Sequence, residues 1–396
     1  MWLVPALRFP EFSGEWHKHS LGEIGETIIG LTYKPSDVVA DNGIIVLRSS
    51  NIKNGVIDYS DLVRVNKNVK DRIITKENDI LVCSRNGSQR LIGKNAIIKR
   101  EDINNTFGAF MMVYRSNDNP FILPLLSTRR YISQVGENLG ARINQITTSD
   151  FNGFEFYFPE NHVERAKIAE LFRLLDERIA TQNKIIEKYE SLIQAIIYKA
   201  KMDGISKGTW QRIALCKVLQ ERNEKNVNGR TICSVSVSQG VVNQVEYLGR
   251  SFAAKQTSHY NIVKYGDIVY TKSPTGNFPY GIIKRSNIRE DVAVSPLYGV
   301  YIPASDSIGV FLHFYFMQPS NAFNYLHPLI QKGAKNTINI TNGRFLENSV
   351  PLPISRSETN TIAGILKITQ TKIEIEKNLL QSYTKEKKYL LHQMFI

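Results

Sequence analysis

The longest regular pattern of hydrophobic and polar positions runs from residue 161 to residue 202. Ile168, Leu175, Gln182, Tyr189 and Ile196 recur every seven residues. Mostly apolar doublets lie between them, at 171–172, 178–179, 185–186 and 192–193. This repeat is typical of a helix whose apolar side packs on another helix. At 1.5 Å per residue the predicted helix is roughly 60 Å long, so it needs a partner along much of its length.

The partner helix is predicted in the same chain, because the pattern returns 194 positions later, in residues 355–396. Pro159 corresponds to Pro353, and Tyr189 to Tyr383. The two helices should pair as a coiled coil through apolar residues in each. These are Ile168, Leu171, Phe172, Leu175, Ile179, Ile186 and Tyr189 in the first helix, and Ile362, Ile365, Leu366, Ile373, Leu380, Tyr383 and Leu390 in the second.

Both helices carry start signals. Asn161 with Glu164, and Ser355 with Glu358, have the spacing of a capping box, in which two free backbone N–H groups of the first turn find side-chain acceptors. Gly204 is predicted to stop the first helix and to open a linker over residues 203–208.

The duplication extends beyond the helices. At the same offset Trp16 corresponds to Trp210 and Phe151 to Phe345, and at an offset of 188 Asp79 corresponds to Asp267. A changing offset is expected when loops of different length join shared strands. The chain is therefore predicted to be a tandem duplication.

Each half is predicted to be a mixed α+β domain followed by a long helix. β-branched and aromatic runs separated by turn residues indicate strands, whereas residues 121–135 and 311–331 indicate helices. The predicted segments are a first domain at 1–155, a first long helix with linker at 156–205, a second domain at 206–350 and a second long helix at 351–396.

Charge narrows the possible partners. The sequence has 50 Lys and Arg against 37 Asp and Glu and a pI near 9.4, which favours a polyanionic partner such as nucleic acid. The three cysteines lack the count and spacing of a disulfide framework or zinc site. We find no signal-peptide pattern and no apolar run of membrane-spanning length, so we expect a cytoplasmic protein without a membrane partner.

The chain resembles the specificity subunit of type I restriction-modification systems. The resemblance rests on the opening residues 7–24, the re-entry at 210–215, the proline followed by a long helix in both halves, and the closing residues 390–395. It implies two target-recognition domains, each reading one half of a bipartite double-stranded DNA site. It also implies that the two helices form an antiparallel coiled coil, in a pseudo-two-fold tandem repeat.

The resemblance assigns chemistry to other subunits. It implies docking of two methyltransferase subunits and association with restriction and translocation subunits. Those partners would use S-adenosylmethionine, ATP and Mg²⁺, whereas this chain would bind no cofactor or metal and catalyse no reaction.

Loops that follow predicted strands hold the candidate DNA-reading residues. Arginine can bind guanine, and asparagine or glutamine can bind adenine, through two hydrogen bonds each. In the first domain the candidates are Ser84, Arg85, Asn86, Ser88, Gln89, Arg90, Arg142, Asn144 and Gln145, with Arg48 and Asn51 as weaker ones. In the second domain they are Lys272, Thr275, Asn277, Lys335, Asn336 and Asn339, with Lys255 and Gln256 as weaker ones. The loops at 84–90 and 271–277 occupy corresponding places with different chemistry, as two unlike half-sites require.

Two other functions are the alternatives. A stand-alone DNA methyltransferase or nuclease would need catalytic motifs; residues 277–280 match an amino-methyltransferase loop incompletely, and residues 87–95 do not fit a phosphate-binding loop. A coiled-coil adaptor would bind proteins only. Binding of S-adenosylmethionine by the isolated chain would favour the enzyme, and failure to retain DNA at low salt would favour the adaptor.

Overall fold

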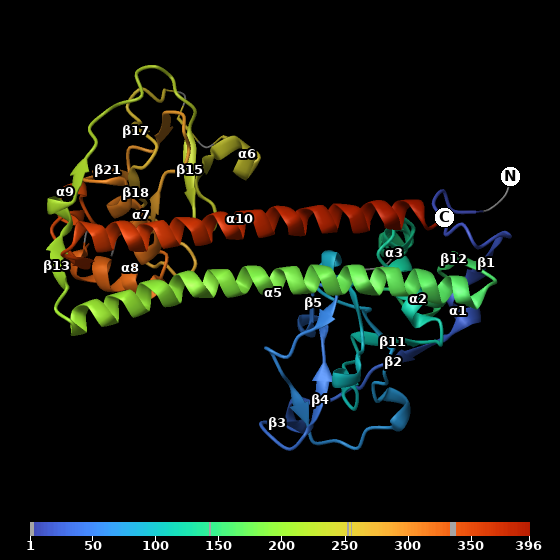
Figure 1. Ribbon diagram of the computed structural model, residues 1–396. Helices are drawn as coiled ribbons and strands as arrows, with labels where there is room; N and C mark the ends of the chain where they lie inside the picture. The colour runs from blue at the N-terminus through green and yellow to red at the C-terminus, as the bar shows by residue number, and fades with distance from the viewer. Residues whose placement is uncertain (1–3, 142–143, 252, 255, 333–337) are drawn as a thin grey trace. The chain divides into compact units, whose positions relative to one another are not determined.

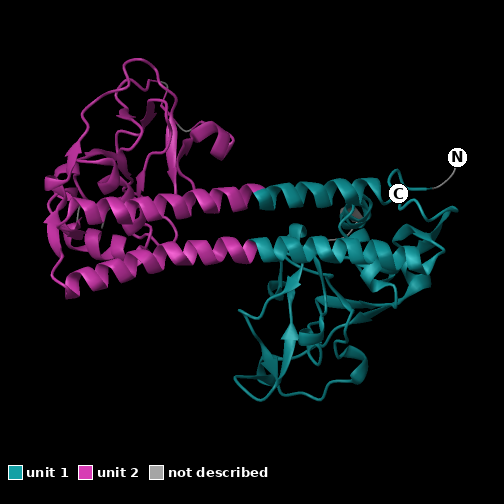
Figure 2. Ribbon diagram, in the orientation of Figure 1, with its two compact units in different colours: residues 1–182, 379–396 teal, residues 183–378 magenta. Residues whose placement is uncertain are grey.

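The computed structural model describes residues 4–141, 144–251, 253–254, 256–332 and 338–396. The chain forms two compact units (Figure 2). Unit 1 comprises residues 1–182 and 379–396, and unit 2 comprises residues 183–378. Two long helices, α5 (His162–Ser206) and α10 (Arg356–Gln393), contribute residues to both units (Figure 1).

Unit 1 is built on short sheets whose strands are antiparallel, except that β10 (Thr106–Phe107) and β4 (Ile44–Leu47) are parallel. Its central sheet has the order β2 (Glu26–Ile29), β11 (Met111–Arg115), β8 (Ile80–Cys83) and β9 (Asn95–Ile97). A second sheet has the order β10, β4, β7 (Arg64–Val65) and β3 (Val38–Val39). The remaining pairs are β1 (Trp16–Ser20) with β12 (Glu155–Pro159) and β5 (Ile52–Lys53) with β6 (Val56–Ile57). The helices are α1 (Leu21–Ile24), α2 (Asn119–Leu125), α3 (Arg129–Ala141) and α4 (Thr148–Asn152).

Unit 2 has an equivalent central sheet, with the order β14 (Leu219–Glu221), β21 (Gly299–Pro303), β18 (Ile268–Tyr270) and β19 (Ile283–Arg285). The strand pairs are β13 (Trp210–Ala214) with β24 (Ser349–Pro353), β15 (Cys233–Ser236) with β16 (Gly240–Asn243), β17 (Asn261–Val263) with β20 (Val292–Val294), and β22 (Gln331–Lys332) with β23 (Ile338–Asn339). The helices are α6 (Gln244–Leu248), α7 (Asp306–Phe316), α8 (Pro319–Leu326) and α9 (Asn342–Phe345).

The strand pairing repeats between the units. Trp16 pairs with Pro159 in unit 1, and Trp210 pairs with Pro353 in unit 2. The two central sheets also have the same strand order and the same antiparallel directions. The predicted tandem repeat of mixed α+β domains with two long helices is thus confirmed.

The turn that precedes β8 in unit 1 recurs before β18 in unit 2. In unit 1 the Asp79 carboxylate accepts a hydrogen bond from the Lys76 backbone N–H at 2.8 Å, and in unit 2 Asp267 accepts from the Lys264 N–H at 2.8 Å. Each carboxylate is buried and holds a guanidinium, although Arg115 supplies it in unit 1 and Arg222 in unit 2. The carboxylate position is therefore kept, while its cationic partner is the last residue of β11 in unit 1 and the residue after β14 in unit 2.

The long helices run antiparallel within unit 1. Lys387 Nζ lies 2.5 Å from Asp176 Oδ1, and the Arg178 guanidinium donates to Tyr383 Oη at 2.8 Å. The Phe172 and Phe395 rings lie 5.5 Å apart, and Phe395 also packs against the buried Trp16. The segment that directly follows α10 therefore belongs to the core of unit 1.

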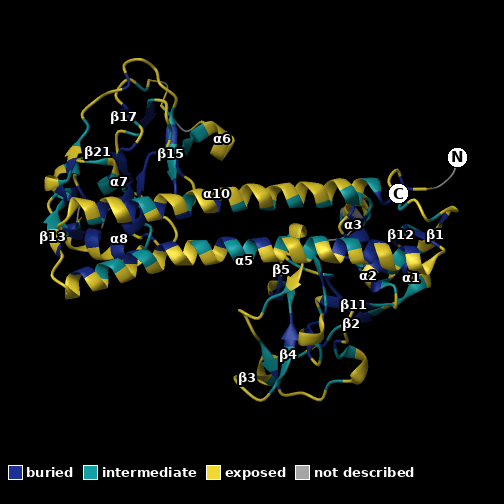
Figure 3. Ribbon diagram, viewed as in Figure 1, coloured by how far each residue is buried: buried dark blue, intermediate teal, exposed yellow. Residues whose placement is uncertain are grey.

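In unit 2 the second half of α5 pairs with the first half of α10. Lys377 Nζ lies 2.7 Å from Glu190 Oε1. The side of the two helices that faces the viewer is mostly exposed, with intermediate residues interspersed (Figure 3). Of the predicted stripe, Ile168, Phe172, Ile186, Ile362, Leu366 and Ile373 are buried, whereas Leu171, Leu175, Ile179, Tyr189, Leu380, Tyr383 and Leu390 are half-buried.

The prediction for Ile365 was wrong, because its side chain is 45% exposed. Leu366 is buried beside it and takes the inward position. A seven-residue pattern alone does not decide which of two adjacent apolar residues faces the partner.

The predicted capping boxes form only in part. Ser355 Oγ accepts from the Glu358 N–H at 3.4 Å, but each glutamate carboxylate binds a side chain that is distant in the sequence. Asn161 Oδ1 accepts from the Val163 N–H at 2.9 Å, but the buried Glu164 carboxylate accepts both Nε and Nη2 of Arg8 at 2.7 Å. Glu358 Oε1 likewise accepts from Trp210 Nε1 at 2.6 Å. Both glutamates join the first turn of a long helix to a distant segment of the same unit.

Gly204 does not stop α5, which continues to Ser206. A Cβ atom at position 204 would lie 1.9 Å from Cδ1 of Trp210. Gly204 therefore makes room for the indole ring. The turn after the helix lies at Gly208, where φ is +68°.

The single helix predicted at 121–135 is two helices, α2 and α3, separated at residues 126–128. Leu126 N–H bonds to Ile122 O, and Thr128 Oγ1 donates to Leu125 O at 2.7 Å, which closes the first helix. Among the described residues, no helix is both long and apolar enough to cross a membrane.

Candidate nucleic-acid interface

Three loops predicted to read DNA meet in unit 1. The loop at residues 84–90 follows β8, and Asn86 Nδ2 donates to Ser49 Oγ at 3.0 Å. Asn144 Nδ2 donates to the Gly87 carbonyl at 3.0 Å, and the Asn86 N–H donates to the Asn144 carbonyl. Loops at 48–51, 84–90 and 144–146 therefore form one surface, called the unit 1 loop cluster below.

The amides of Asn86 and Asn144 position this cluster. Asn86 Oδ1 accepts from the Ser88 N–H at 3.0 Å while its Nδ2 is bound to Ser49. Asn144, whose φ is +50°, uses its own Nδ2 on Gly87. The half-buried Gln145 faces Arg85 through a backbone bridge. These side chains fix the loop, while Arg85, Gln89 and Arg90 are exposed.

The structure does not support Asn51 as a DNA-reading residue. Its side chain is fully buried, Oδ1 accepts from the Arg48 N–H at 2.9 Å, and Nδ2 donates to the carbonyls of Asp58 and Asp61. Arg48 Nη2 lies 2.8 Å from Asp61 Oδ2. Asn51 therefore closes a turn, and Arg48 carries a charge that is largely neutralised within the chain.

In unit 2 the loop after β18 has a different form. Thr275 and Phe278 exchange two backbone hydrogen bonds around Gly276 and Asn277, and buried Phe278 anchors this hairpin. Thr275 and Asn277 are exposed. Lys272 is half-buried, and its pKa is lowered because burial disfavours the ammonium, an effect that the Glu221 carboxylate opposes.

Several predicted residues cannot be placed in this surface. Arg142, Lys255, Lys335 and Asn336 lie outside the described residues. Asn339 is the last residue of β23, and Gln256 is exposed in the loop before β17. Their contribution to a DNA surface stays a prediction.

Sequence reasoning missed Phe110, which lies beside the unit 1 loop cluster. Its side chain is 59% exposed, and the Arg85 guanidinium lies 5.1 Å from its ring centroid. Ser84 Oγ and the backbone N–H groups of Ser84 and Arg85 all donate to the Phe110 carbonyl. The run 107–116 reads as one strand, but β11 begins only at Met111. Gly108 was the one signal of a turn there.

Two basic side chains, the half-buried His313 and the buried Lys284, lie at the central sheet of unit 2. His313 on α7 accepts from the Arg285 N–H through Nδ1 at 3.1 Å. Burial, followed by the charges of Lys284 and Arg285, lowers the pKa of His313 to about 3. Lys284 on β19 is 3% exposed, and burial lowers its pKa to about 8. His313 is thus neutral near pH 7 and serves as a structural acceptor.

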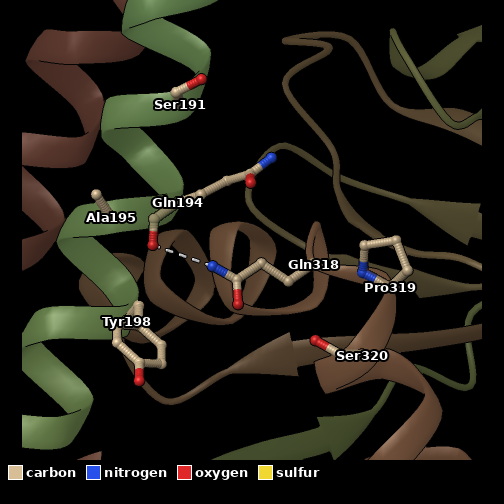
Figure 4. A pocket seen from close by; sticks show the side chains of 7 residues that line it. All are labelled: Ser191, Gln194, Ala195, Tyr198, Gln318, Pro319 and Ser320. Atoms are coloured by element: carbon tan, nitrogen blue, oxygen red, sulfur yellow. Dashed lines mark hydrogen bonds between the residues drawn. The ribbon is translucent and has the colours of Figure 1, made fainter. Parts of the chain in front are cut away.

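An open hollow of about 440 Å³ lies between the second half of α5 and the start of α8, within unit 2 (Figure 4). It is lined by Ser191, Gln194, Ala195, Tyr198, Gln318, Pro319 and Ser320. Gln318 Nε2 donates to the Gln194 carbonyl at 3.1 Å, which ties α8 to the long helix. The lining offers hydroxyl and amide groups without a carboxylate or an imidazole. Within the described residues, three or more His, Cys, Asp or Glu side chains nowhere come together in a group that could hold a metal ion.

Known proteins share both sequence and fold with this chain. Residues 13–191 match the family described as "Type I restriction modification DNA specificity domain". The type I restriction enzyme StySPI specificity subunit of Salmonella potsdam is 27% identical over 196 residues, which cover 47% of this chain and 42% of that protein. The EcoKI specificity subunit of Escherichia coli K12 is 27% identical over 193 residues, which cover 46% and 41%.

These matches span about two fifths of the length of the curated relatives. A crystal structure of the type I restriction-modification system S subunit from M. genitalium matches with a TM-score of 0.63 at 16% identity, covering 100% of this chain and 99% of that one. That likeness concerns the fold. The predicted resemblance is thus confirmed: residues 13–191 match the DNA specificity domain of type I restriction-modification systems, and the chain is similar in sequence to two specificity subunits and in fold to a third.

Proposed function

We propose that this chain is the non-catalytic DNA-recognition subunit of a type I restriction-modification complex, in which each unit reads one half of a bipartite site. One observation carries the proposal: equivalent strands β8 and β18 of the two central sheets end in loops of different chemistry. A duplicated scaffold with two unlike loops suits one duplex that carries two unlike half-sites.

The DNA-contacting residues are proposed from their exposure and chemistry. In unit 1 they are Arg85, Gln89 and Arg90, held in place by Asn86 and Asn144. In unit 2 they are the exposed Thr275 and Asn277, with the half-buried Lys272 beside them in the same loop. Guanidinium and amide groups suit base edges in the major groove, and ammonium groups suit phosphates. The excess of basic residues supplies the sequence-independent attraction to the duplex.

The long helices are proposed to set the gap between the half-sites. α5 has 45 residues and α10 has 38. At 1.5 Å per residue these lengths correspond to roughly 68 and 57 Å. Half-sites read from one side of B-DNA lie about 34 Å or a multiple apart. A paired helical spacer of this length is suited to such a gap, whereas a flexible linker would accept many gaps.

The partners follow from the proposed role. The chain would bind two methyltransferase subunits and associate with restriction and translocation subunits, which would use S-adenosylmethionine, ATP and Mg²⁺. The segments predicted at 1–155, 156–205, 206–350 and 351–396 are proposed as recognition domain, spacer helix, recognition domain and spacer helix. A cytoplasmic location is part of this proposal.

The test is methylome sequencing of cells with and without this gene. A bipartite methylated motif should disappear with the gene and return when it is restored. Purified chain, assembled with its methyltransferase subunits, should retain duplexes that carry that motif at a salt concentration that releases scrambled DNA. An unchanged methylome, or S-adenosylmethionine binding by the isolated chain, would contradict the proposal.

A further inference from the structure

Each unit exposes one large apolar side chain at the same place in its fold. In unit 1 a turn closed by the Met111 N–H on the Gly108 carbonyl leads into β11, and Phe110 is its third residue. In unit 2 a turn closed by the Tyr298 N–H on the Ser295 carbonyl leads into β21, and Leu297 is its third residue. The side chains are 59% and 70% exposed, respectively. Equivalent turns therefore present an apolar group to solvent in both units.

Strand pairing places both turns beside the proposed reading loops. β11 and β8 are antiparallel neighbours with Met111 opposite Cys83, so the turn before β11 adjoins the loop after β8. β21 and β18 are also antiparallel neighbours, with Gly299 opposite Tyr270, so Leu297 adjoins the loop that begins at Thr271. The apolar group therefore accompanies the polar reading loop in each unit.

The surroundings of Phe110 indicate which part of DNA it would meet. The thymine C5-methyl group is the apolar feature of the major groove, where arginine, asparagine and glutamine also read base edges. Insertion between two base pairs would require both faces of the ring, but Arg85 covers one face at 5.1 Å. Leu297 has no ring to stack. An apolar contact in the groove fits both residues, whereas stacking fits neither.

We infer that Phe110 and Leu297 are specificity-determining residues, each of which contacts a thymine methyl group in the major groove of the half-site read by its own unit. This inference rests on the proposed DNA-recognition function. It adds an apolar discriminator of A·T pairs to the polar loop of each unit.

The test uses the assembled complex and duplexes in which each thymine of the target is replaced in turn by uracil, which lacks only the C5-methyl group. Loss of one buried methyl contact should weaken wild-type binding about fourfold, equivalent to roughly 0.8 kcal/mol. The effect should occur at a thymine in the half-site that Arg85→Ala impairs. Phe110→Ser should abolish this sensitivity, and Phe110→Leu should keep it. Leu297→Ser should act in the same way on the other half-site.

Val38→Ser is the matched control. Val38 is also a large exposed apolar residue of unit 1. It lies on β3, at the opposite edge of its sheet from β10, the strand that leads into the Phe110 turn. Its variant should keep the wild-type uracil sensitivity, and all variants should unfold at the wild-type temperature. Unchanged sensitivity in Phe110→Ser, or no sensitivity in the wild type, overturns the inference. Equal weakening on every duplex, with reduced DNA bending, would indicate a wedge and would also overturn it. Failure of the wild-type complex to prefer its target over scrambled DNA would instead refute the proposed function.

Discussion

Replacing Arg85 and Gln89 should affect DNA binding but not stability, whereas replacing Asn86 should affect both, although all three residues lie on one loop. The Arg85 guanidinium packs on the Phe110 ring, and both Arg85 and Gln89 are exposed. Replacing both by alanine should change the free energy of unfolding by no more than about 0.5 kcal/mol, as is usual for surface positions. Each lost two-hydrogen-bond base contact should cost roughly 1 to 3 kcal/mol of binding, or about 5- to 160-fold.

Asn86→Ala should behave differently because its amide is used within the protein. It removes the hydrogen bonds to Ser49 Oγ and from the Ser88 N–H, each at 3.0 Å. At about 0.5 to 1.5 kcal/mol each, the loss is roughly 1 to 3 kcal/mol of stability. Half-site reading should weaken as a consequence of the displaced loop.

Denaturant unfolding and competition binding measure the two effects. The competitors are duplexes in which one half-site or the other is scrambled. Arg100→Ala is the control for loss of an exposed positive charge in unit 1. Equal loss at both half-sites in the Arg85 and Gln89 variant, or wild-type stability of Asn86→Ala, would refute the division between reading and positioning residues.

Three further predictions concern unit 2. Gly204→Ala should destabilise the protein by about 1 to 3 kcal/mol, because the new Cβ would displace the Trp210 ring, whereas Gly364→Ala, a helical glycine with nothing within 4 Å, should stabilise it by up to about 1 kcal/mol in denaturant unfolding. Lys284→Met should raise the free energy of unfolding by up to about 3 kcal/mol at pH 7, because burial lowers the pKa of the lysine to about 8 in the folded protein. The gain should vanish above pH 10.5, where the lysine is neutral in the folded and the unfolded protein alike. Between pH 6.5 and 3 only the unfolded state protonates this histidine, so His313 should cost the wild type about 1.4 kcal/mol of unfolding free energy for each pH unit of acidification. His313→Asn should remove this dependence on pH. Equal slopes of unfolding free energy against pH in the two proteins would contradict the prediction.

Features that repeat within the sequence were predictable from it. The seven-residue pattern anticipated α5 and α10, and the predicted duplication, in which Trp16 corresponds to Trp210, agrees with the equivalent strand pairs that contain β1 and β13. The seven-residue pattern and the 194-residue offset both repeat, so the interpretation of one residue can be checked against its counterpart. The loop after β8 was recognisable because polar residues follow a continuous apolar run.

Features that depend on a distant partner were not predictable. Glu164 lies at capping-box spacing, yet Arg8, which is 156 positions away, binds its carboxylate. In the sequence Asn51 resembles an exposed polar loop residue. In the structure its side chain is buried, and its amide donates to the backbone carbonyls of Asp58 and Asp61. Local spacing describes what a side chain can reach along the chain, whereas tertiary packing decides which partner it takes.

The proposal that the paired long helices set the gap between the two DNA half-sites has one direct test. One heptad would be inserted after Gln182 in α5 and a matching heptad after Asn378 in α10, which adds about 10 Å, close to three base pairs of B-DNA. Methylome sequencing should then show the two original half-sites separated by a longer gap. Altered half-site sequences with the original gap would contradict the account.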